Sequence, residues 1–291
     1  MTLADSNMTK TPKITTRDIY GSLSEATHQA LAEVSSRAQS DPIIIGLILT
    51  GSAGRGMATQ HSDVDVIVIR DEAQSAPTRE VTHSSAIDEI PMTLTELETI
   101  KPVGSEGAWE RWSFAWAKIL YDSSCGRVSD GVRRQPILNE QEIQDLLIRD
   151  SRLDEYINFT YRALKSHRDG RADAARLDSA ESIASFLDVL FALCGRVRPY
   201  NKYLAWEMGE HPLTGLGEDW NDGGLMRRVN GLLQGSEHVM REMFTAIEKE
   251  CRAYDLQIGK SMMSEVIDGW DEELKMLRGL PGNHAASIQP H

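Results

Sequence analysis

Cysteine is scarce in this chain, and the few cysteines present form no recognisable pattern. The 291 residues contain only Cys125, Cys194 and Cys251, which lie far apart. An odd number of widely spaced cysteines, with no CxxC pair and no His/Cys cluster, argues against a disulfide framework and against a zinc site. We therefore expect a reduced protein in the cytoplasm.

Positive charge and long apolar runs are also lacking. Lys and Arg number 31 against 44 Asp and Glu, which gives a net charge of −13. Proteins that bind nucleic acid usually carry a basic face, so nucleic acid is not the expected substrate, and a cationic small molecule suits this balance better. No apolar run reaches membrane-spanning length, and the polar N-terminus does not resemble a signal peptide. We expect no membrane association, and the composition gives no oligomeric state.

Residues 43–69 predict a strand, a glycine-rich loop and a second strand. Ile43–Thr50 is an apolar run of the length of a buried strand. The following residues, Gly51–Gly56, contain three glycines, which let the backbone adopt positive φ and approach an anion closely. The β-branched run Val66–Ile69 is the second strand. The loop therefore offers backbone N–H groups and the Ser52 hydroxyl to a phosphate.

Two aspartates, Asp63 and Asp65, stand at the start of that second strand. Residues two apart on a strand point to the same face. Two carboxylates side by side are costly unless a cation lies between them. Mg²⁺ favours carboxylate oxygens together with substrate phosphates. The loop and the pair together predict a site for phosphoryl or nucleotidyl transfer.

The order Thr50-Gly51-Ser52, ten residues, then Asp63-Val64-Asp65-Val66 resembles the signature of the nucleotidyltransferase superfamily. This superfamily includes DNA polymerase beta and the aminoglycoside adenylyltransferases. Its signature is an apolar residue with Gly-Ser, a spacer of about ten residues, and alternating Asp and apolar residues. The one departure is polar Thr50, where an apolar residue is usual. A solvated hairpin would not place an apolar strand directly after the aspartates.

The resemblance implies an α+β protein. We expect an N-terminal nucleotidyltransferase α/β domain with a mixed sheet at 16–135 and a C-terminal helical bundle at 136–280, with tails at 1–15 and 281–291. Helical periodicity and capping signals place helices at 17–39, 139–164, 173–197, 225–252 and 261–278, and further strands at 87–94 and 119–122.

In the resembling family, a third carboxylate lies on a strand beside the Asp pair. It acts as general base or as a further metal ligand. Asp88 and Glu89 are the candidates, and because they are adjacent only one of them can face the site. We prefer Asp88, since an apolar-Asp opening of this strand is closer to the family. Asp63, Asp65 and Asp88 are thus the predicted catalytic residues and Mg²⁺ ligands.

Four residues of the first domain are predicted to contact the nucleotide. Gly51 and Ser52 would bind the β and γ phosphates. Arg55 would neutralise phosphate charge, or is a solvated loop arginine. Ser62 would add a phosphate contact, or caps a turn.

Aromatic residues recur in two further segments, one of which is also basic. Arg196–Trp206 combines cationic and aromatic side chains, and we expect Lys202 to reach the triphosphate unless this segment is an interdomain surface. Trp109, Trp112 and Trp116 are spaced to share one helix face, either in the core or stacked on a ligand.

These patterns predict a metal-dependent enzyme that moves a nucleoside monophosphate onto a hydroxyl of a small molecule. The expected donor is ATP or another nucleoside triphosphate, and the expected acceptor is an aminoglycoside-like cation. One alternative is an antitoxin-type enzyme that adenylylates a protein, although such enzymes are usually shorter and lack the helical bundle. A second alternative is a non-catalytic nucleotide sensor, which the intact Asp63-Val64-Asp65 order disfavours.

Overall fold

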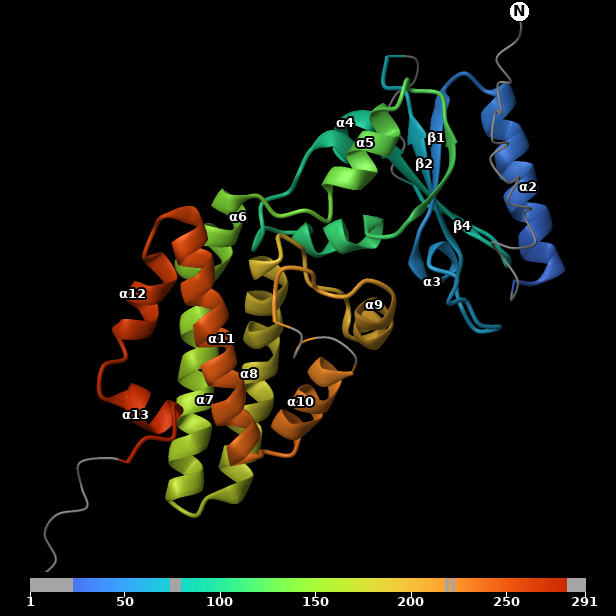
Figure 1. The fold of residues 1–291 in the computed structure, drawn as a ribbon. Helices are drawn as coiled ribbons and strands as arrows, with labels where there is room; N and C mark the ends of the chain where they lie inside the picture. The colour runs from blue at the N-terminus through green and yellow to red at the C-terminus, as the bar shows by residue number, and fades with distance from the viewer. Residues whose placement is uncertain (1–22, 74–79, 218–219, 221–222, 282–291) are drawn as a thin grey trace, which may run out of the picture. The chain divides into compact units, whose positions relative to one another are not determined.

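The computed structural model describes residues 23–73, 80–217, 220 and 223–281, and it divides into two compact units (Figure 1). The first unit contains the residues up to Ile100 together with Ser113–Gln135. The second contains Lys101–Trp112 and the residues from Pro136 onward. The predicted tail 1–15 and the start of the predicted helix 17–39 lie outside the described residues.

Residues 101–112 belong to the second unit, whereas we expected them in the first domain. Two buried side chains explain this placement, because both are only 1% exposed. Arg111 forms an ion pair with Glu142. The indole Nε1 of Trp112 donates a hydrogen bond of 2.7 Å to Glu207 Oε2. Both partners come from later in the chain, so local sequence gave no sign of them.

A five-stranded mixed sheet forms the centre of the first unit, as predicted. The strands are β1 (Ile44–Leu49), β2 (Asp65–Arg70), β3 (Thr82–His83), β4 (Asp88–Thr93) and β5 (Lys118–Asp122). Their order is β3-β4-β2-β1-β5. The β2–β4 pair is parallel and the other pairs are antiparallel. β1 therefore ends where β2 and β4 begin.

Helices cover both faces of this sheet. On one face α2 (Glu25–Ser40) contributes Leu31 and Val34 to a core with Val64, Val66 and Val68. On the other face α4 (Leu94–Glu98) and α5 (Arg127–Arg134) pack on Ile67 and Ile69 through Leu97 and Val132. The alternation of these buried residues along β2 follows the two-residue period of a strand. Helix α5 was not predicted, because it has only two apolar residues, Val128 and Val132.

Pro91 lies on β4, which is not the edge strand that a proline predicts. It is paired with Val68 of β2 on one side. On the other side β3 pairs only with Glu89 and Asp88. Within the described residues, the pairing of β3 with β4 therefore does not extend to Pro91. The N–H that proline lacks would have had no partner on that side, so no hydrogen bond of the ladder is lost.

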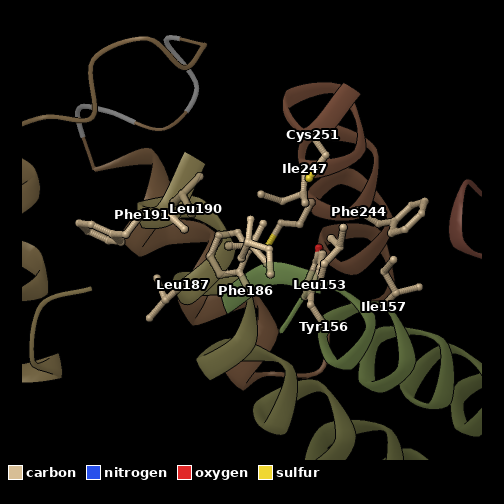
Figure 2. Close-up of a cluster of buried hydrophobic side chains, with 14 of the residues drawn as sticks. Leu153, Tyr156, Ile157, Phe186, Leu187, Leu190, Phe191, Phe244, Ile247 and Cys251 are labelled. Atoms are coloured by element: carbon tan, nitrogen blue, oxygen red, sulfur yellow. The ribbon is translucent and has the colours of Figure 1, made fainter. Parts of the chain in front are cut away.

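The second unit is helical. Its elements are α6 (Glu140–Gln144), the π-helix η2 (Asp145–Arg149), α7 (Arg152–Arg168), α8 (Ala172–Leu193), the 3₁₀-helix η3 (Asn201–Tyr203), α9 (Leu204–Glu210), α10 (Gly224–Leu233), α11 (Glu237–Ile258), α12 (Met262–Asp268) and α13 (Glu273–Leu277). Figure 2 shows side chains of α7, α8 and α11 meeting in its core, including Tyr156, Phe186 and Phe244. No helix in the described ranges has both the length and the apolarity that a membrane crossing needs.

Three of the long predicted helices are interrupted. The predicted capping box of Asn139 and Glu142 is present at the start of α6. The helix then changes to a π turn and breaks at Ser151, whose φ is +60°. The predicted helix 225–252 breaks between α10 and α11 at Gly235, and the one at 261–278 breaks between α12 and α13. The apolar period continues across each break, because the helices on both sides pack against the same core.

Candidate active site

The glycine-rich segment after β1 folds into one helical turn, α3 (Gly51–Gly54). Gly51 has φ +61°, and a Cβ on it would lie 3.0 Å from Asp65 Oδ2. A Cβ on Gly54 would lie 2.3 Å from the carbonyl oxygen of Leu49. Both positions therefore require glycine, the first because of its backbone conformation and the second because the turn folds tightly onto the end of β1. The turn is thereby held against the Asp65 carboxylate.

Asp65 and Asp88 open two neighbouring strands and lie in register with each other. Because the β2–β4 pair is parallel, both residues stand at the same end of the sheet, with strands about 4.8 Å apart. Directly paired residues also point to the same face. The structure thus brings these two predicted carboxylates together beside Gly51.

Asp63 stands just before β2 and is exposed. Val64, between the two aspartates, is buried, and its carbonyl accepts a hydrogen bond of 2.9 Å from the Asp88 N–H. The backbone therefore remains paired with β4 at this point. Alternation about Val64 puts Asp63 on the side of Asp65, although Asp63 lies outside the strand that we predicted for it.

The neighbouring carboxylates Asp88 and Glu89 are directed to opposite faces. Glu89 is paired with Val66, which belongs to the α2 side, and it forms an ion pair with Arg37 of α2. This hydrogen bond raises the pKa of Arg37. Asp88 instead lies 3.1 Å from Nδ1 of His83 on β3. Sequence reasoning missed His83, because a two-residue strand leaves no periodic signal.

The described residues contain no group of three or more His, Cys, Asp and Glu side chains arranged to hold a metal ion. The pair of Asp65 and Asp88 is nevertheless chemically suited to Mg²⁺, which is commonly held by one or two carboxylates with substrate phosphates and water. Two aligned carboxylates repel each other unless a cation or a proton offsets them. The donor set therefore fits a divalent ion that arrives with a phosphate ligand.

Arg55 was predicted to neutralise phosphate or to be solvated, and its placement suits neither role. Its side chain is 7% exposed. Nη1 donates to the Gly51 carbonyl at 2.6 Å, and Nη2 donates to the carbonyls of Ser113 and Ala115 at 3.0 and 2.7 Å. The guanidinium ties the α3 turn to the segment before β5. Arg55 therefore stabilises the α3 turn by tying it to residues 113–115.

The two loop serines differ in their surroundings. Ser52 is the second residue of α3 and is half-buried. Ser62 Oγ accepts a hydrogen bond of 2.9 Å from the Thr59 N–H. Ser62 therefore caps the turn before Asp63, which is the second of the two roles we considered for it.

Lys202, Trp109 and Trp112 belong to the second unit, and Trp116 belongs to the first. Lys202 is exposed on η3, with Nζ 4.7 Å from the ring centroid of Tyr203. The tryptophans do not share a helix face, because the 3₁₀-helix η1 (Ala108–Phe114) ends before Trp116. Trp112 is buried, whereas Trp109 is 67% exposed and Trp116 is 42% exposed.

Comparison with known proteins agrees with this geometry. Residues 29–108 match the family model of the nucleotidyltransferase domain. The matched segment contains Gly51, Asp65 and Asp88. Residues 29–108 are a nucleotidyltransferase domain by this match, and most of them lie in the first unit. A nucleotidyltransferase domain supports nucleotidyl transfer as the general reaction.

A solved structure described as a nucleotidyltransferase-like protein from Exiguobacterium sibiricum is also similar to the chain. It is 14% identical, the match covers 83% of this chain and 90% of that chain, and the TM-score is 0.31. The likeness is loose, and the site of the nucleotidyltransferase domain does not depend on it. No curated protein matches the sequence.

Proposed function

We propose that this protein transfers a nucleoside monophosphate, AMP from ATP, onto a hydroxyl of a small molecule. The observation that carries the proposal is the alignment of Asp65 with Asp88 beside the Gly51 turn. Two carboxylates and a glycine turn at one end of a sheet supply what a bound triphosphate needs, namely oxygen ligands for its cation and a close backbone approach for its phosphates.

Asp65 and Asp88 would hold Mg²⁺ through their carboxylate oxygens, whereas Asp63, the third ligand that the sequence predicts, lies exposed before β2. When bound, such ions stabilise the entering and leaving oxygens of an in-line displacement at phosphorus. Asp88 would accept the proton of the acceptor hydroxyl, because its strand β4 lies one strand farther from the Gly51 turn than β2, which carries Asp65. Glu89 is occupied on the other face by Arg37.

Gly51 and Ser52 would receive the β and γ phosphates. The first N–H groups of a helix have no acceptor within the helix, so the α3 turn presents donors toward an anion. Arg55 fixes the turn so that these donors are arranged before the nucleotide arrives.

An aminoglycoside-like cation remains our candidate acceptor, supported by the net charge of −13. The scarcity of cysteine supports a cytoplasmic setting, where such small molecules would meet ATP.

The test is pyrophosphate release with Mg²⁺ and each nucleoside triphosphate, in the presence and absence of aminoglycosides. We expect the Asp65→Asn variant to lose turnover by a factor of at least about 10³, because it removes a charged ligand from the pair. Asp130→Asn is the matched control, since Asp130 is a solvent-exposed carboxylate of α5. Full activity of Asp65→Asn would refute the assignment. Nucleotide binding without pyrophosphate release would identify a sensor instead.

A further inference from the structure

A second candidate ligand site lies wholly within the helical unit. It is a cavity of about 520 Å³ whose lining comes from the segments near residues 103–109 and 197–201 and from the helices α7 and α8. Trp109, Trp112 and Tyr200 form an aromatic wall. Arg152, Asp188 and Arg198 form a polar wall. Cavities that combine apolar surface with a few convergent polar groups are typical of small-molecule sites.

The aromatic wall is fixed in place, yet it offers an open face. The indole of Trp112 is buried and held by Glu207. The Tyr200 ring lies 4.9 Å from that of Trp112, and its hydroxyl donates to the Trp109 carbonyl at 3.0 Å. Trp109 itself remains 67% exposed. The side chains of Trp112 and Tyr200 therefore have little conformational freedom to lose when a ligand binds. The exposed indole of Trp109 can stack on a ring of the ligand.

On the polar wall, two arginines are the donors of the described residues that face the Asp188 carboxylate, and both stay beyond ordinary hydrogen-bond length. Arg152 Nε and Arg198 Nη1 face its two oxygens at 3.5 and 3.6 Å. A charge-assisted hydrogen bond is usually about 2.7–2.9 Å long, so neither arginine satisfies the carboxylate. Burial raises the pKa of Asp188 even though both arginines act to lower it. The ionised carboxylate would therefore gain from a donor supplied by a ligand.

Arg152 lacks an acceptor for one of its donors, as Asp188 lacks a close donor, within the part of the chain that the structure describes. Its Nη1 donates to Glu155 at 2.8 Å, whereas its Nε is buried and has no hydrogen-bond acceptor among the described residues. A hydroxyl group can donate to Asp188 and accept from Arg152 Nε at once. A cationic amine would meet two arginines here, which disfavours it.

We propose that this cavity binds a neutral hydroxylated ring, such as a sugar or a cyclitol. The ring stacks against Trp109, and adjacent hydroxyls bridge Asp188 and Arg152. The proposal does not depend on the nucleotidyltransferase function, because every residue that carries it belongs to the second unit.

Saturation-transfer NMR and calorimetry with the full chain test this site, with methyl β-glucoside and myo-inositol as probes and glucosamine as the cationic comparison. Binding of the glucoside alone identifies a sugar site, and binding of myo-inositol alone identifies a cyclitol site. We expect Asp188→Asn to weaken binding of the neutral probe by at least about tenfold, because it removes a charged acceptor. Asp173→Asn is the matched control, since Asp173 is an exposed carboxylate on the same helix.

Trp109→Ala provides the second variant, because Trp109 is exposed and its removal leaves the core intact. We expect the same loss of at least about tenfold for this variant. Asp65→Asn should bind the probes as the wild type does, which separates this site from the nucleotide site. Absence of saturation transfer from both neutral probes would overturn the proposal, and so would an affinity equal to that of the wild type in Asp188→Asn or in Trp109→Ala. Tighter binding of glucosamine would also contradict it.

Discussion

The sharpest stability prediction concerns Arg55, whose side chain joins two segments of the first unit. Its guanidinium contacts three backbone carbonyls, those of Gly51, Ser113 and Ala115, at 2.6 to 3.0 Å. Replacement by methionine keeps most of the apolar stem and removes all three hydrogen bonds. The carbonyls would then lose their donor in a place that water reaches poorly.

The expected loss follows from the energetics of such bonds. A hydrogen bond from a charged donor contributes about 1.5–3 kcal/mol, and a buried acceptor left without its donor costs about 1–3 kcal/mol. The three bonds share one guanidinium, so their contributions do not add in full. We therefore expect Arg55→Met to lower the free energy of unfolding of the first unit by about 3–5 kcal/mol.

Hydrogen exchange followed by mass spectrometry measures this loss, because it resolves the first unit from the helical unit. Amides of β1 and β2 should exchange about 10² to 4 × 10³ times faster in Arg55→Met than in the wild type. Arg133→Met is the matched control, since Arg133 is 71% exposed on the neighbouring helix α5, and its exchange should be unchanged. Wild-type protection in Arg55→Met, together with a loss of nucleotide affinity, would show that the guanidinium faces phosphate and that our reasoning is wrong.

The carboxylate pair, the helical unit and the cysteines each allow one further prediction. Asp88→Asn should reduce turnover by at least about tenfold, whereas Glu89→Gln should leave it within about twofold, because only Asp88 shares the face of Asp65; equal losses in a steady-state assay would contradict this. Glu207→Gln should lower the unfolding free energy of the helical unit by about 1.5–3 kcal/mol in urea titrations, because its partner Arg196, whose side chain is 21% exposed, then loses its counter-charge, and an unchanged midpoint would exclude that role. With native protein, iodoacetamide should label exposed Cys125 first, because burial raises the pKa of Cys194 to about 11 and also raises that of Cys251; mass spectrometry showing early labelling of Cys251 would overturn the assignment.

Sequence signals were sufficient wherever the deciding interaction is local. The strand, glycine turn and second strand around Gly51 are encoded by neighbouring residues, and so is the capping box of Asn139 and Glu142. The mixed sheet and the helical second half were also predicted, because they follow from the order of these elements and from the family resemblance. Local period and turn chemistry act within a few residues, so a single chain displays them.

The same reasoning failed where a distant partner decides the structure. Arg55 has the appearance of a phosphate-binding arginine until the carbonyls of Ser113 and Ala115 are in place. Trp112 is drawn into the second unit by Glu207, which lies 95 residues later. Helical spacing of tryptophans carries no information about such partners, so the predicted stripe was wrong.

The arrangement of the candidate site depends on two constraints of different range. Asp65 is held at the Gly51 turn across the β1–β2 ladder, where the Thr50 N–H donates to the Asp65 carbonyl at 3.0 Å. Asp88 arrives on a parallel strand, and a slip of one residue in that strand would exchange it for Glu89 on the site face. The ion pair of Glu89 with Arg37 on the opposite face opposes this slip, because the shifted register would turn Glu89 away from α2. We infer that the contact of Glu89 with Arg37 helps to hold β4 in the register that aligns Asp88 with Asp65, and that Glu89→Gln preserves this register because the glutamine oxygen can still accept from Arg37.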